Sequence, residues 1–232
     1  MPIGVLVDCA CVLAGALIGC LAGSAVPEKM RKDLHVFLGI CSMSIGINSI
    51  IKVSAMAPVV FAVLIGYTVG AALKLEDRLT ALADKILRRL PIPKSEGFSM
   101  EQYVTVVVLF CASGFGIYAT FVEAMSGNSS VILSKSVLDW MTALIFAIGL
   151  RWAVAIIPLP MAAVLLAMFG TGKLIAPVVS TEMLMDFTAC GGILTLAAGL
   201  RVAGIKNTAI TNLIPALVLV MPLSWLWSLL PL

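Results

Sequence analysis

The chain has 232 residues, of which 61% are hydrophobic and 12% are charged, and its net charge is +3. Soluble domains average roughly 45 to 50% apolar and about 25% charged residues, so this composition excludes a water-soluble fold, which could not bury so much apolar surface. The absence of a basic, aromatic-rich stretch argues against a nucleic-acid partner and leaves the lipid bilayer as the expected partner.

Charge-free windows run through the whole chain, at residues 53–73, 102–122, 152–172 and 207–232. Each can cross hydrocarbon about 30 Å thick, which takes about 20 residues at 1.5 Å per residue, and backbone in lipid must be helical to pair its polar groups. The sequence therefore predicts an all-α, polytopic membrane bundle of eight helices, near residues 3–25, 34–51, 54–74, 102–123, 134–151, 153–174, 182–203 and 208–230.

Between the third and fourth of these helices, residues 76–90 carry leucines and isoleucines at helical spacing, opposite charged residues. This pattern is typical of an amphipathic helix on the cytoplasmic leaflet, although a connector helix that packs on other loops fits it as well. A Pro-Ile-Pro stop and a linker at 94–99 follow. One integral membrane domain is thus expected, with a front three-helix portion (1–75), the amphipathic helix and linker (76–100), and a five-helix back portion (101–232).

The basic residues predict the orientation. With the N-terminus outside, twelve of the fifteen Lys and Arg residues fall in inside loops and three in outside segments. This asymmetry follows the positive-inside rule and places both termini outside. If the segment 157–160, which holds two prolines, dips in and returns, seven crossings result instead.

Small residues recur at helical spacing. Gly15, Gly19 and Gly23 form a GxxxGxxxG stripe, and Gly66 with Gly70 forms a second GxxxG. Such stripes let helices approach closely, either within the chain or between two copies, so a homo-oligomer through the first stripe is an alternative to intramolecular packing. Residues 37–58 and 187–215 also share a pattern of Phe, small residues, Lys and Pro, although the spacings differ by several residues. The pattern is explained either by chance or by a weak inverted repeat of the kind found in transporters.

Two predicted helices have short charge-free cores. Eleven residues separate Asp139 from Arg151, and fourteen separate Asp186 from Arg201. These cores span only about 18 and 22 Å. Either the helices are broken or the aspartates lie below the membrane surface, where ionisable groups are candidates for function.

The candidate binding residues gather toward the outer side. Lys135 stacks one turn from Asp139, and Glu182 one turn from Asp186. Together with Asp8 and Glu123 they predict an acidic vestibule for a cation or proton, with Asp139 and Asp186 in one shared, water-accessible cavity. The alternative is that Lys135 and Asp139 neutralise each other at a helix end and Glu182 caps its helix.

Gly191 and Gly192 complete the candidate set. They follow Asp186 by about one and a half turns, so the helix could open there and expose carbonyl ligands for an ion. Close packing of a neighbouring helix explains the two glycines equally well.

Cofactor and enzyme functions find little support. The six cysteines lie in apolar runs without a CxxC pair, and the chain has one histidine, His35, which excludes bis-His haem and multi-His zinc. No metal or cofactor is expected. A serine hydrolase would need a buried His, and the motifs of a di-aspartyl protease are absent, so the chain is not expected to be an enzyme.

The sequence resembles a known family. Residues 2–8 (PIGVLVD), 110–112 (FCA), 134–139 (SKSVLD), 191–194 (GGIL) and 212–217 (NLIPAL) are similar to the bacterial inner-membrane family of YqgA and YdfK, catalogued as domain of unknown function 554. Asp8 and Trp140 depart from the Asn and Gly common in that family. The resemblance implies an inner-membrane protein described as a transporter, so we expect transport of a small solute or ion, coupled to a cation or proton; the alternative is a non-transporting scaffold.

Overall fold

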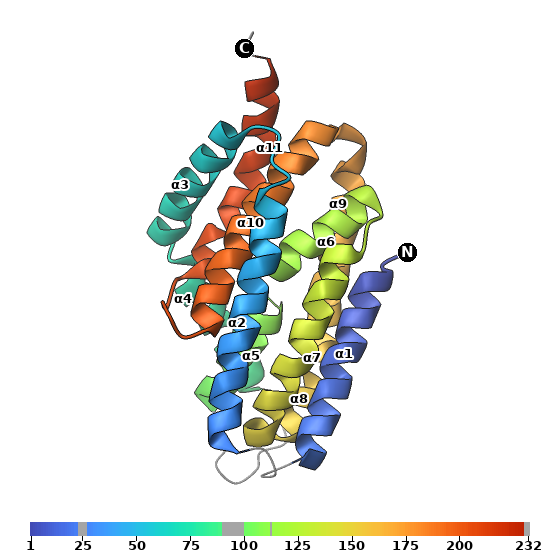
Figure 1. The fold of residues 1–232 in the computed structure, drawn as a ribbon, viewed down its shortest axis with the longest axis vertical. Helices are drawn as coiled ribbons and strands as arrows, with labels where there is room; N and C mark the ends of the chain where they lie inside the picture. The colour runs from blue at the N-terminus through green and yellow to red at the C-terminus, as the bar shows by residue number, and fades with distance from the viewer. Residues whose placement is uncertain (23–26, 90–99, 112, 230–232) are drawn as a thin grey trace.

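The computed structural model describes residues 1–22, 27–89, 100–111 and 113–229 (Figure 1). In these ranges the regular elements are helices, without a strand. In chain order they are α1 (Ile3–Ala22), α2 (Glu28–Ile50), α3 (Met56–Ala72), α4 (Leu75–Leu87), α5 (Met100–Cys111), α6 (Gly114–Ser126), α7 (Ser130–Leu150), α8 (Trp152–Ile156), α9 (Pro158–Ile175), the 3-10 helix η2 (Ala176–Val178), α10 (Thr181–Val202), the 3-10 helix η3 (Ile210–Leu213) and α11 (Ile214–Ser228).

Seven helices are long and apolar enough to cross a membrane, or eight if α3 and α4 are counted as one span bent by 52°. The predicted all-α polytopic fold is therefore confirmed. The segment with two prolines does not reduce the number, because α8 and α9 form one candidate span over Trp152–Val178, with Pro158 and Pro160 in the first turn of α9. Proline is tolerated there since that turn has no N–H to pair within the helix.

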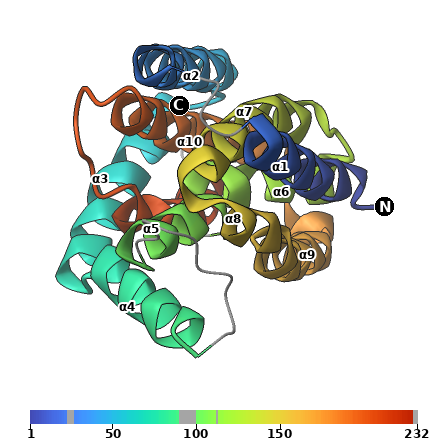
Figure 2. The same cartoon turned by 90° about the horizontal axis from the view of Figure 1, so that it is seen from below.

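Glycines determine which helices pack together. A Cβ atom on Gly15 would lie 2.1 Å from the carbonyl oxygen of Trp140, and one on Gly19 would lie 2.2 Å from that of Leu144, so α1 runs parallel to α7 at backbone contact. Figure 2 shows α1 beside α7 and α2 beside α10. The first stripe is thus filled within the monomer by α7, as far as the described residues go, and Gly23 lies outside them.

The other front helices pack in antiparallel pairs with back helices. A Cβ on Gly46 would lie 2.7 Å from the carbonyl oxygen of Gly192, which brings α2 against α10. Gly66 and Gly70 in turn meet Ala216 and Asn212, which brings α3 against α11 and η3. The front and back portions therefore share one bundle, and the opposite directions within these pairs are those that an inverted repeat requires.

The span expected at 102–123 is not one helix but two. α5 ends at Cys111, and α6 begins at Gly114 after Ser113, whose hydroxyl accepts a hydrogen bond from the N–H of Gly116 (3.0 Å). A serine cap followed by two glycines favours a new helix start over continuation. A helix break therefore lies within an apolar span.

By contrast, α7 and α10 are continuous helices of 21 and 22 residues, each about 32 Å long. The first explanation for their short charge-free cores, a broken helix, is therefore wrong, and Asp139 and Asp186 lie inside continuous helices. That the aspartates lie below the membrane surface stays a prediction. The expected opening at Gly191 and Gly192 is wrong, because α10 continues through both residues. A Cβ on Gly191 would lie 2.2 Å from the ring of Tyr118, so close packing accounts for the glycine.

The predicted amphipathic helix corresponds to α4, which ends at Leu87, before the Pro-Ile-Pro stop and the 94–99 linker that lie outside the described residues. Lys74 joins it to α3 with a left-handed φ of 50°. One face packs on α5 and η3, while Leu82 and Ile86 remain exposed beside basic residues. α4 is thus an amphipathic helix that packs on two other helices through one face and exposes the other; its place on the cytoplasmic leaflet stays a prediction.

Candidate functional site

A buried ion cluster joins α1 and α7. The ammonium of Lys135 donates to Asp8 Oδ2 (2.8 Å) and to Asp139 Oδ2. Asp8 lies seven residues, or two turns, before Gly15 on the same face of α1. Because Gly15 has no side chain to hold the helices apart, Asp8 comes within reach of Lys135. Sequence reasoning placed Asp8 only in a broad vestibule; its position on the glycine stripe was the signal for this closer role.

The cluster is almost closed to solvent. Asp8 is 0% exposed and Lys135 2%, while the Asp139 side chain retains 15% exposure. Burying an ion inside a membrane protein costs several kcal/mol unless it is paired, and here one ammonium pairs with two carboxylates. With all three groups ionised, the cluster has a net charge of −1. It can therefore accept a proton or a cation more readily than an anion.

Glu123 lies one helical turn above this cluster, at the end of α6. Its Oε1 accepts hydrogen bonds from the N–H of Gly4 (2.6 Å) and the hydroxyl of Ser129 (2.8 Å). The carboxylate thus stabilises the N-terminal turn of α1, where backbone N–H groups and the helix dipole favour negative charge. Glu123 is 2% exposed, so the predicted acidic group on the outer side is buried in the bundle.

Asp186 has a different set of partners. Its Oδ1 accepts from the N–H groups of Ser54 (2.9 Å) and Ala55 (2.8 Å), and its Oδ2 accepts from the hydroxyl of Ser224 (2.6 Å). The carboxylate therefore ties the start of α3 and the middle of α11 to α10. In the described structure Asp186 and Asp139 have no hydrogen-bond partner in common, so the two aspartates belong to separate clusters. Neither of them lines the cavity of about 780 Å³ described below, so the structure does not bring them together there as the sequence predicted.

Glu182 and Gly192 remain apart from both clusters. Glu182 lies exposed in the first turn of α10, where Ser180 caps the helix by accepting from the N–H of Met183 (3.3 Å). A carboxylate at this position interacts favourably with the helix dipole, as the capping alternative proposed. Gly192 serves the packing of α10 on α2.

A cavity of about 780 Å³ lies among α4, α5, α7, α10 and η3. Its polar wall includes the ion pair between Arg201 and Glu76 (2.9 Å) and the exposed carboxylate of Asp77. Apolar residues of α5, α7 and α10 also line it. Sequence reasoning missed this cavity, because it requires α4 to fold back against η3.

The cavity reaches the level of the ion cluster. Its lining includes Ser113, the cap at the α5–α6 break, and Thr142, one turn along α7 from Asp139. A Cβ on Gly116, in the first turn of α6, would lie 3.2 Å from Cε of Lys135. The inner end of the cavity is therefore one helical turn from Asp139 along α7. Along α6 it is one turn from Gly116, which meets Lys135.

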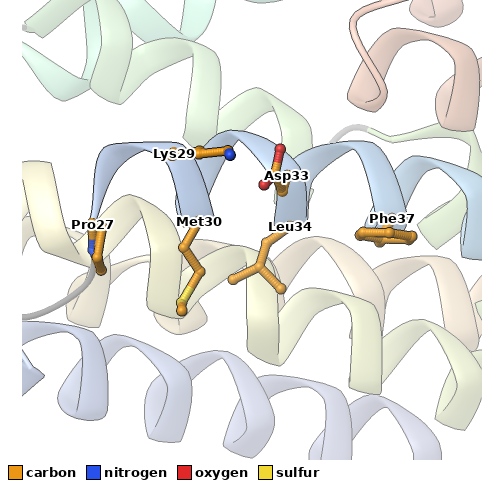
Figure 3. A pocket seen from close by; sticks show the side chains of 6 residues that line it. All are labelled: Pro27, Lys29, Met30, Asp33, Leu34 and Phe37. Atoms are coloured by element: carbon orange, nitrogen blue, oxygen red, sulfur yellow. The ribbon is translucent and has the colours of Figure 1, made fainter.

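A second hollow, of about 440 Å³, follows the first turns of α2 at the surface (Figure 3). Figure 3 shows Met30 and Leu34 pointing from α2 toward the neighbouring helices. Its lining is mostly apolar and contains no residue of either buried cluster: Pro27, Lys29, Met30, Asp33, Leu34 and Phe37. Such a groove suits contact with lipid chains better than a polar solute.

The chain is similar to proteins of known sequence over almost its whole length. A family described as "Protein of unknown function (DUF554)" matches residues 3–225. The "Uncharacterized protein YqgA" of Escherichia coli (strain K12) is 38% identical, with 98% of each chain covered. The "Uncharacterized membrane protein YdfK" of Bacillus subtilis (strain 168) is 28% identical, with 93% of each covered. No solved structure matches the chain.

Proposed function

From the premise that this membrane protein belongs to the DUF554 family, we propose that it is a multi-pass transporter of the bacterial inner membrane, which moves a small solute or ion coupled to a cation or proton. The observation that carries this proposal is the 780 Å³ cavity that ends at the α5–α6 break, beside a buried ion cluster. Transporters place solute and coupling-ion sites at interrupted helices near the middle of the bundle.

The cavity gives access from one end of the bundle. It is walled by α4 and by the last turn of α10, and Figure 1 places both in the half where α1 ends and α2 begins. That half carries the basic loops that the charge distribution assigns to the cytoplasm. We therefore propose an inward-facing state with both termini periplasmic, in which the packed α1, α6 and α7 close the outer side.

The ion cluster supplies the coupling chemistry. Lys135 holds Asp8 and Asp139 by charge, so protonation of Asp139 or arrival of a cation weakens the attraction that joins α7 to α1. A ligand shifts a conformational equilibrium only by its different affinity for the two states, and breaking this pair provides such a difference. Asp139, which keeps some exposure and lies a turn from the cavity, is the residue expected to exchange the proton or cation.

The two other function classes are less well supported. A hydrolase would need Asp139 and Asp186 to share a proton, whereas they have separate partners. A scaffold that assembles through the first glycine stripe would need that face of α1 to be free for a partner. At Gly15 and Gly19, however, α7 already covers it.

The proposal is tested with full-length protein in liposomes on a solid-supported membrane, where added solutes and ions from a chemically diverse panel are expected to produce a current. Asp139→Asn should abolish the current, because the amide keeps the volume of the side chain and removes its charge. Asp33→Asn, a matched change on the exposed face of α2, should retain it. An unchanged current in Asp139→Asn would remove the cluster from the mechanism, and silence of the wild type across the panel would favour the scaffold role.

A further inference from the structure

Three buried oxygen atoms around the ion cluster have no hydrogen-bond partner among the described residues: Asp8 Oδ1, Thr120 Oγ1 and Glu123 Oε2. Among the residues that the structure describes, these three are the only buried side-chain N and O atoms without a hydrogen-bond partner. A buried polar atom without a partner costs about 1–3 kcal/mol, and more for a charged group. Three such oxygens in one region indicate a bound species that satisfies them.

The helix contacts place the three atoms in one layer. On α6, Thr120 lies four residues after Gly116, which meets Cε of Lys135, and three residues before Glu123, which accepts from Gly4. These residues share one face of α6. On α1, Asp8 lies one turn after Gly4 and binds Lys135. Thr120 therefore lies between the contact of Gly116 with Lys135 and the contact of Glu123 with Gly4. Asp8 lies beside the same Lys135, one turn from the same Gly4, so both residues lie at one level between α1, α6 and α7.

The hydroxyl of Thr120 differs from those of other buried threonines. Thr142, Thr188 and Thr195 each donate to the carbonyl four residues earlier, at 2.7, 2.7 and 2.8 Å. This is the usual way for a helical threonine to satisfy its hydroxyl in an apolar setting. Thr120 makes no such bond although it is 0% exposed, so its oxygen remains available to a ligand.

The charges of this layer are unbalanced. Asp8, Glu123 and Asp139 contribute three carboxylates, and Lys135 is the basic side chain that forms ion pairs here in the described ranges. With every group ionised, two negative charges are in excess in a region where an unpaired charge costs several kcal/mol. A bound positive ion offsets both the charge and the unsatisfied oxygens, whereas protonation alone leaves the Thr120 hydroxyl without a partner.

We propose that Asp8 Oδ1, Glu123 Oε2 and Thr120 Oγ1 bind a sodium ion between α1, α6 and α7; this deepens the proposed function by naming the coupling ion. All three are hard oxygen donors, the type that alkali and alkaline-earth cations prefer. Sodium would lie beside Asp8 and compete with Lys135 for its charge.

The site is tested by the thermal stability of the purified full-length protein in detergent, as choline chloride is replaced by NaCl at constant ionic strength. Sodium should raise the Tm in a saturable way, because only the folded protein contains the site. KCl at the same concentration is the control for ion identity and should give no shift. Binding of radiolabelled Na⁺ to the same preparation gives the affinity directly.

Thr120→Val is the decisive variant, because it removes the ligand oxygen without breaking a hydrogen bond. Its Tm in choline chloride should equal that of the wild type, while its sodium affinity should fall by about 10- to 100-fold. Thr195→Val, at an equally buried threonine of α10, should leave the sodium affinity unchanged. The proposal is overturned if the wild type shows no sodium-specific shift, if Thr120→Val binds sodium normally, or if Thr195→Val loses as much affinity.

The binding measurement is independent of transport. Sodium binding in a protein that gives no current in liposomes would retain the site and refute the transporter. A current that is the same in choline and in sodium, together with no sodium-dependent shift, would refute the site and retain the transporter.

Discussion

Replacing Lys135 with Met tests whether the ammonium holds the bundle together. Met has nearly the same length and suits the apolar surroundings, but it leaves Asp8 and Asp139 facing each other without a counter-ion. Removing one partner of a buried ion pair costs about 3–5 kcal/mol. For a chain of this size that corresponds to a Tm lower by about 6–20 °C at neutral pH.

The stability deficit of Lys135→Met should depend on pH, and the unpaired carboxylates determine its direction. Without Lys135, the folded protein is stable only when Asp8 or Asp139 binds a proton, so the folded variant binds more protons than its unfolded form and gains stability as the pH falls. The Tm deficit of Lys135→Met relative to wild type should therefore shrink between about pH 7 and about pH 5. Thermal unfolding of both proteins is followed by the intrinsic fluorescence of the four tryptophans. The double variant Asp8→Asn, Lys135→Met should recover much of the loss at pH 7. A loss below about 1 kcal/mol would show that the pair has no structural weight. A deficit that is the same at both pH values would show that protonation does not relieve the unpaired carboxylates.

Three further outcomes are expected. Gly15→Ala should cost about 1–3 kcal/mol in thermal unfolding, because its Cβ would lie 2.1 Å from a carbonyl oxygen of α7, whereas Gly149→Ala, which meets nothing within 4 Å, should be neutral or stabilising. A double-mutant cycle on Glu76 and Arg201 should give a coupling of about 1 kcal/mol, and a coupling near zero would mean that the ion pair does not hold α4 against α10. A periplasm-dependent reporter fused after Leu232 should be active, since both termini are expected outside; activity of a cytoplasmic reporter instead would require an odd number of crossings.

Much of the fold could be predicted from the sequence because the bilayer imposes strong local constraints. Runs of about 20 apolar residues must be helical in lipid, and this gave the positions of the spans to within a few residues. The pair of Lys135 and Asp139 was also predictable, because residues four apart on a helix are neighbours whatever else surrounds them. The glycine stripe on α1 correctly indicated a close helix contact, although it could not name the partner helix.

Only the tertiary structure decided which helices meet. Three features depend on contacts between residues more than 100 positions apart. Asp8 pairs with Lys135, Asp186 accepts hydrogen bonds from the N–H groups of Ser54 and Ala55, and α4 folds back to form one wall of the cavity. In a membrane, every span is apolar on most faces, so hydrophobicity does not distinguish one neighbour from another. Shape does: the helices pair where glycines allow backbone contact, and those pairings bring the charged side chains together.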